Sequence, residues 1–161
     1  MNTYQLAFLI GAVAGLRSTI APAAISWAAR SGGLRLENSG LDLLGSGPAP
    51  YILSLLAAGE LIVDKHPKVP SRKAAGPFIV RILSGALCGA AIGTSRQAAA
   101  GGFLAGAFGG AAGTLAGFES RSQLVRAAGG NDLPIALLED AVAIGGAFLT
   151  VSQASRNAST P

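Results

Sequence analysis

Five long apolar stretches, separated by shorter polar segments, run through this chain of 161 residues. Apolar stretches of this kind are typical of helices that lie in a membrane. They predict helices over residues 4–29, 50–64, 78–93, 98–118 and 134–152. A helix that crosses the bilayer needs about 20 apolar residues, and the second and third stretches are shorter than that. The pattern therefore predicts an all-α, multi-pass membrane bundle with four or five crossings.

Prolines, glycines and polar residues mark where these helices are expected to begin and end. Residues 30–33 (RSGG) end the first helix, Pro50 lies in the first turn of the second, and Pro67 stops the second. Asp132 can cap the last helix, with Pro134 in its first turn. These positions follow from the missing N–H and fixed φ of proline, which suit a first turn and stop a helix that precedes it.

The two ends of the chain differ in character. The apolar run at the beginning has no basic segment before it and contains Arg17, so we expect a retained first helix and not a signal peptide. The residues after position 152 are polar. We therefore expect one membrane domain over residues 1–152 and a flexible polar tail over residues 153–161.

Composition changes how such a bundle must pack. Half of the residues are hydrophobic, only 12% are charged, and 23 are glycine. Helices in lipid associate through small residues that allow close approach, so a chain poor in bulky side chains can still form a bundle. Glycines spaced four residues apart are expected to form the packing faces, either within the chain or between two copies in a homodimer: Gly11, Gly15, Gly102, Gly106, Gly110, Gly113 and Gly117.

The basic residues suggest an orientation. Lys65, Lys68, Arg72 and Lys73 make residues 65–77 the most basic segment between helices. Because basic segments stay on the cytoplasmic side, we expect this segment to be cytoplasmic. With five crossings the N-terminus would share that side and the C-terminus would lie on the other. The lipid bilayer is then the expected partner, in an inner membrane.

Charged residues inside apolar stretches are the strongest functional signal. Arg17, Glu60, Glu139 and Asp140 each interrupt a stretch that is otherwise apolar, and Asp64 lies one turn beyond Glu60. A charge in the hydrocarbon costs several kcal/mol, so it persists only with a partner, a water path or a task. We expect these five residues to form a polar site near the middle of the bilayer. Adjacent residues of a helix point about 100° apart, so only one of the last two can face Arg17.

The first and fourth stretches also resemble each other. When Phe8 is aligned with Phe103, Gly11 matches Gly106 and Gly15 matches Gly110. A single helix between two such copies would reverse the second copy relative to the first. This is the inverted-repeat arrangement of many transporters, which place their site where the repeats meet.

Two interpretations of the charged residues remain open. In the first, Arg17 and the carboxylates bind an ion, proton or small solute that the protein moves across the membrane. In the second, the charges only clamp the helices together, and the protein is a structural or accessory component.

Other functions lack support in the sequence. The motifs of metalloproteases, serine hydrolases and nucleotide-binding proteins do not occur, so we expect no enzyme activity, no cofactor and no metal site. The basic residues are not interleaved with aromatic ones, so we expect no nucleic-acid partner. Cys88 is the only cysteine, which excludes an internal disulfide, and we expect an inert buried thiol.

Three short motifs give the chain a resemblance to a known family. They are residues 15–18 (GLRS), residues 59–65 (GELIVDK) followed by Pro67, and residues 137–140 (LLED). Their order and spacing resemble a bacterial membrane-protein family known as domain of unknown function 4126. The resemblance covers residues 11–144 and implies a small multi-pass protein of the bacterial inner membrane. It implies no activity, but its motifs contain the same charged residues.

Overall fold

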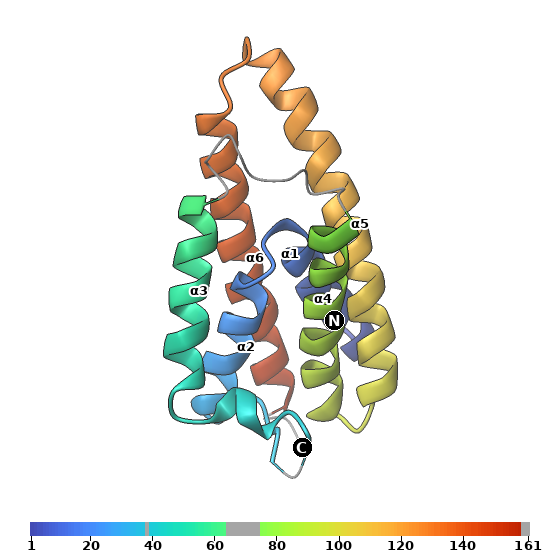
Figure 1. Cartoon of the computed structure of the whole chain (residues 1–161). Helices are drawn as coiled ribbons and strands as arrows, with labels where there is room; N and C mark the ends of the chain where they lie inside the picture. Colours follow the sequence, from blue (N-terminus) through green and yellow to red (C-terminus); the bar gives the residue numbers. More distant parts are fainter. Residues whose placement is uncertain (38, 64–74, 159–161) are drawn as a thin grey trace.

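The computed structural model describes residues 1–37, 39–63 and 75–158. These residues form an entirely helical bundle (Figure 1), which confirms the predicted all-α class. In chain order the elements are α1 (Thr3–Leu16), α2 (Ile20–Arg30), the short 3₁₀ helix η1 (Asp42–Gly45), α3 (Ala49–Val63), α4 (Ala75–Thr94), α5 (Ala99–Ala127) and α6 (Leu133–Ala158). Among the described residues, α4, α5 and α6 are long and apolar enough to cross a membrane, and α1 and α3 are shorter apolar helices.

The structure divides the first predicted helix, residues 4–29, into two. Arg17 follows α1 with an extended backbone (φ −140°, ψ 112°), and α2 begins three residues later at Ile20. Pro22 then lies in the first turn of a new helix, where its missing N–H costs nothing. In a continuous helix the same proline would remove a hydrogen bond and clash with the carbonyl of Ser18. The sequence predicted one helix through this point, and the structure has a full reversal.

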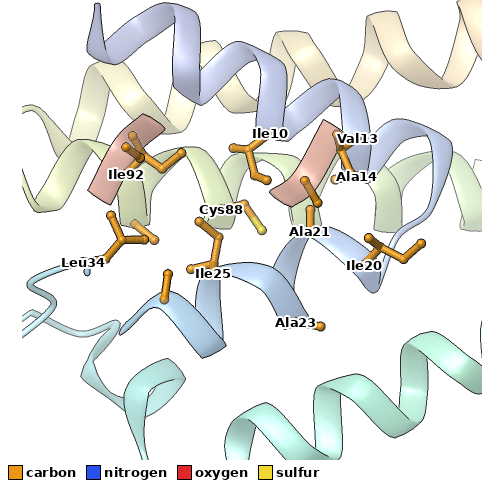
Figure 2. Packing of buried hydrophobic residues seen from close by; sticks show 14 of the residues in the cluster. Ile10, Val13, Ala14, Ile20, Ala21, Ala23, Ile25, Leu34, Cys88 and Ile92 are labelled. Carbon is orange, nitrogen blue, oxygen red and sulfur yellow. The ribbon is translucent and has the colours of Figure 1, made fainter. Parts of the chain in front are cut away.

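The reversal makes α1 and α2 a helical hairpin with both open ends at one end of the bundle. The side chain of Asn157 donates a hydrogen bond to the Met1 carbonyl at 3.2 Å, and Gly33 packs against Ser155 of the same helix. Figure 2 shows the two arms side by side and the turn that joins them. At 1.5 Å per residue the arms are about 21 Å and about 17 Å long, roughly half the thickness of a bilayer with its headgroups. Each arm is therefore shorter than a helix that crosses a bilayer, and both open ends lie beside the end of α6.

The interior is built mainly from small residues. A Cβ atom added to Gly106 of α5 would overlap the carbonyl oxygen of Gly85 in α4, and one added to Gly11 of α1 would overlap Gly106. The three backbones are therefore in direct contact at this level. Most of the predicted packing glycines likewise face the backbone of a neighbouring helix: Gly11, Gly15, Gly102, Gly106, Gly110 and Gly113. Gly117 is buried as well. These glycine faces therefore form contacts between helices of the same chain.

Large apolar side chains point outward. Leu55, Phe108 and Phe148 are exposed by 70% or more of their surface. The largest fully buried side chain, by contrast, belongs to Arg17. A smaller apolar cluster joins the hairpin to α4, where Ile10, Ile25 and Cys88 converge (Figure 2). This distribution, with bulk outside and small or charged residues inside, suits a lipid environment.

The direction of α5 corrects the predicted inverted repeat. Gly11 lies against Gly106 and Gly15 lies against Gly110, so the matched residues of α1 and α5 are in contact along helices that run in the same direction. Copies related by inversion would run in opposite directions. The reason is the turn after Leu16, which adds one reversal that hydropathy did not show.

The same added reversal changes which ends lie together. Met1 contacts Asn157, whereas the end of α3 and the beginning of α4, which flank residues 64–74, lie at the opposite end of the bundle (Figure 1). The expectation that the C-terminus lies across from Met1 is therefore wrong, and the basic residues Lys65, Lys68, Arg72 and Lys73 lie outside the described residues.

Candidate functional site

The turn at the tip of the hairpin lies deep inside the apolar part of the bundle. At the other end of α2, Trp27 packs edge-to-face on Tyr51 at 5.3 Å between ring centroids, and both rings are exposed. Paired aromatic side chains of this kind mark the membrane–water boundary. Ser18 is nine residues from Trp27, which is about 13 Å along α2. The turn therefore lies about 13 Å from this aromatic pair, inside the bundle.

The beginning of α2 is held by a carboxylate from α3. One oxygen of Glu60 accepts from the main-chain N–H and the hydroxyl of Ser18, both at 2.9 Å. The other accepts from the N–H of Thr19 at 2.9 Å and from its hydroxyl at 2.5 Å. The first N–H groups of a helix have no partner within it and carry partial positive charge. The carboxylate of Glu60 accepts from the first of these N–H groups, and its full negative charge complements their partial positive charge.

The end of α1 is held by a guanidinium from α4. Nη1 of Arg81 donates to the carbonyl oxygens of Gly15 at 2.8 Å and Leu16 at 2.5 Å. Its Nη2 lies 3.6 Å from Oε1 of Glu60, which links the two ends of the turn electrostatically. The hydroxyl of Thr114 also donates to the Gly15 carbonyl at 3.2 Å. The terminal carbonyls carry partial negative charge, so a cation is the complementary partner.

Ser84, one turn after Arg81 on α4, completes the turn. Its hydroxyl donates to the carbonyl oxygen of Ser18 at 2.5 Å. Acceptor and donor groups of the turn are thus paired with side chains from three other helices. This is the condition for irregular backbone at membrane depth, where an unsatisfied polar group costs several kcal/mol.

Arg17 forms a separate ion pair with α6. Its Nη2 lies 2.6 Å from Oδ1 of Asp140, and the two side chains are 0% and 10% exposed. Two charges removed from water lose most of their hydration energy, and only their mutual attraction at close contact offsets that loss. The short distance and the burial make this pair the innermost contact between the hairpin and α6.

Glu139 points away from this pair, as the geometry of adjacent residues requires. Its carboxylate lies 3.4 Å from Nη1 of Arg121, which also forms a two-pronged ion pair with Asp132 at 2.7 and 2.8 Å. Glu139 and Arg121 line a groove of about 370 Å³ between α1, α5 and α6. The structure thus brings together Arg17, Glu60 and Asp140 but leaves Glu139 outside the tip, and Asp64 lies outside the described residues.

The sequence analysis missed Arg81. It interrupts the third apolar stretch in the same way as Arg17 interrupts the first, so the same criterion would have identified it. With Arg81 included, the tip contains two cations and two carboxylates, and its formal charge is zero. Among the described residues, no group of three or more histidine, cysteine, aspartate or glutamate side chains could hold a metal ion.

These features define a class: an all-helical membrane bundle with a helical hairpin whose tip is held by charged side chains from other helices. The chain belongs to the family described as domain of unknown function 4126, whose model matches residues 5–154. The match includes the hairpin from Gln5 onward, Glu60, Arg81 and Asp140. Comparisons with curated proteins and with solved structures gave no match.

Proposed function

We propose that this protein moves a small ion or solute across the membrane at the tip of the hairpin. The observation that carries the proposal is the turn itself. The end of α1 and the beginning of α2 meet inside the bundle, among charged side chains from α3, α4 and α6, and we place this turn near the middle of the bilayer. Membrane proteins that bind ions or solutes at mid-depth commonly use such interrupted helices, because their ends present concentrated partial charge.

The polar groups of the tip suit exchange better than covalent chemistry. Carboxylates, guanidinium groups, hydroxyls and main-chain carbonyls can each release one hydrogen-bonding partner and accept another. A species that enters must replace one of these partners, because the turn tolerates no unpaired polar group. In the proposed movement, the polar groups of the tip therefore bind one another in one state and bind the transported species in the other.

A clamp is the second candidate, and one observation favours it. Glu60 has four donors within 2.9 Å, and Asp140 lies 2.6 Å from Arg17, so both carboxylates are held closely by groups of the hairpin. A network that only fixes the hairpin would need no exchange. In that case the protein serves as a structural or accessory membrane component.

Flux into liposomes containing the purified protein separates these candidates. We expect flux of at least one species from a panel of cations, protons and anions, and its loss in Glu60→Gln and Asp140→Asn variants that remain folded. Glu139→Gln is the matched control, because it removes the neighbouring carboxylate of α6 without touching the tip. Loss of folded protein in the first two variants, with no flux from the wild type, would establish the clamp.

The proposed orientation follows from the basic segment. Residues 65–77 are the most basic segment between helices, and basic segments stay in the cytoplasm. We therefore propose that α3 ends and α4 begins on the cytoplasmic side. Met1 and Asn157 then lie on the far side. Labelling of single cysteines at positions 2 and 157 by an impermeant reagent, in a Cys88→Ala background, should occur from outside the cell. Labelling only after permeabilisation would reverse the orientation.

A further inference from the structure

The guanidinium of Arg81 lies in a cradle of oxygen atoms at the end of α1. Two main-chain carbonyls, those of Gly15 and Leu16, accept from one of its nitrogens at 2.8 and 2.5 Å. A carboxylate oxygen of Glu60 lies 3.6 Å from another nitrogen. The residue is only 5% exposed. The cradle thus combines two partial negative charges with one full negative charge, in a place that water does not reach freely.

The same set of oxygens would suit a small cation. Carbonyl oxygens of an interrupted helix, with or without a carboxylate, replace the hydration shell of monovalent cations in channels and transporters. An anion has no comparable place, because the N–H groups and hydroxyls of Ser18 and Thr19 already bind Glu60. The electrostatics of the tip therefore favour a cation as its exchangeable partner.

We propose that these oxygens form a binding site for a small monovalent cation, and that the Arg81 side chain fills this site in the present structure. As an extension that rests on the proposed function, the species moved by the protein belongs to the same class. Exchange of one cation for another leaves the formal charge around Glu60 unchanged. The carboxylate can then keep its four donors on the turn while the guanidinium leaves and the cation enters.

Chemical rescue of an Arg81→Ala variant tests the site without an assay of flux. The variant is purified in detergent, and its thermal unfolding is followed by the fluorescence of Trp27, the only tryptophan of the chain. Guanidinium chloride is added at low millimolar concentration, and sodium and potassium chloride are tested in parallel. Total chloride is held constant with the bulky cation N-methylglucamine. Arg126→Ala, at an exposed position near the end of α5, is the matched control.

We expect a saturable rise of several degrees in the Tm of Arg81→Ala with guanidinium, and with sodium or potassium, because a ligand that binds only the folded state stabilises it. The wild type and Arg126→Ala should show no such rise. If Arg81→Ala cannot be purified, Arg81→Gln provides the second variant, since its amide can still donate to one carbonyl. A folded variant whose Tm responds to none of the three cations would overturn the proposal.

The outcomes for the site and for transport can be told apart. Cation-dependent stabilisation of Arg81→Ala, without flux of any species through the wild type, would retain the site and reject transport. Flux of anions alone, with no response of Arg81→Ala to cations, would retain transport and reject the cation site.

Discussion

Two regions hold this bundle together, and they do so by opposite means. Where α1, α4 and α5 cross, the contact consists of glycine backbones with no side chain between them. At the tip of the hairpin, the contact consists of long charged side chains that reach from α3, α4 and α6 to a turn. The first region depends on glycines, whose lack of a side chain lets the backbones touch. The second depends on charged side chains that bind the turn. A chain with few bulky residues can thus fix its helices without a large hydrophobic core.

The largest effect is expected where backbones touch. In Gly106→Leu, the added side chain would overlap the carbonyl oxygen of Gly85, which cannot move without separating α4 from α5. Overpacking costs about 1–3 kcal/mol where neighbouring side chains can give way, and overlap with a backbone that cannot move costs more, enough to keep α4 and α5 from packing. We expect no monodisperse protein in size-exclusion chromatography. Gly145→Leu is the control, because no atom lies within 4 Å of its added Cβ. Equal behaviour of the two variants would show that the close contact is dispensable.

The next largest effect is expected for Arg17. In Arg17→Met, the carboxylate of Asp140 stays buried without its 2.6 Å partner. Breaking a buried pair in this way costs about 3–5 kcal/mol. The double variant Arg17→Met/Asp140→Leu removes both charges and should regain much of that loss in free energy of unfolding, measured by denaturant titration in detergent. If the double variant were as unstable as the single one, the hairpin would depend on Arg17 for a reason other than its ion pair.

A smaller effect is expected for Glu60→Gln. Glutamine keeps one oxygen that can accept from Ser18, but its amide nitrogen cannot accept from the N–H and hydroxyl of Thr19. Leaving buried donors without an acceptor costs about 1–3 kcal/mol. The matched control is Glu119→Gln, whose side chain is exposed on α5. A Tm equal to that of the control would mean that the carboxylate contributes nothing to the stability of the turn.

The smallest effect is expected for Ser84→Ala, which removes one neutral hydrogen bond to the carbonyl of Ser18. Such a bond contributes about 1 kcal/mol. Ser122→Ala, which removes a local and exposed bond on α5, serves as the control. Thermal unfolding of the two variants measures the difference. A loss for Ser84→Ala as large as that for Arg17→Met would indicate that hydroxyl groups, and not charges, dominate the tip.

The sequence predicted the glycine region better than the tip. Four-residue spacing of glycines has one physical use in a membrane, close helix packing, and the structure places Gly11, Gly106 and Gly110 in such contacts. At the tip, the sequence identified Arg17, Glu60 and Asp140 as buried charges. It could not show that Arg17 opens a reversal, because a kink and a turn leave the same hydropathy around Pro22. The predicted direction of α5, and the prediction that the C-terminus lies across from Met1, were wrong because of this one reversal.

The tip also sets an order for biogenesis. Residues 3–30 leave the ribosome before Glu60, Arg81 and Asp140, whose side chains bind the turn and Arg17. Until those residues have been synthesised, a hairpin at full depth would expose Arg17 and the ends of two helices to lipid. We therefore expect the hairpin to reach its final position in the bundle only after α6 has been synthesised, although its own residues precede those of α6 in the chain.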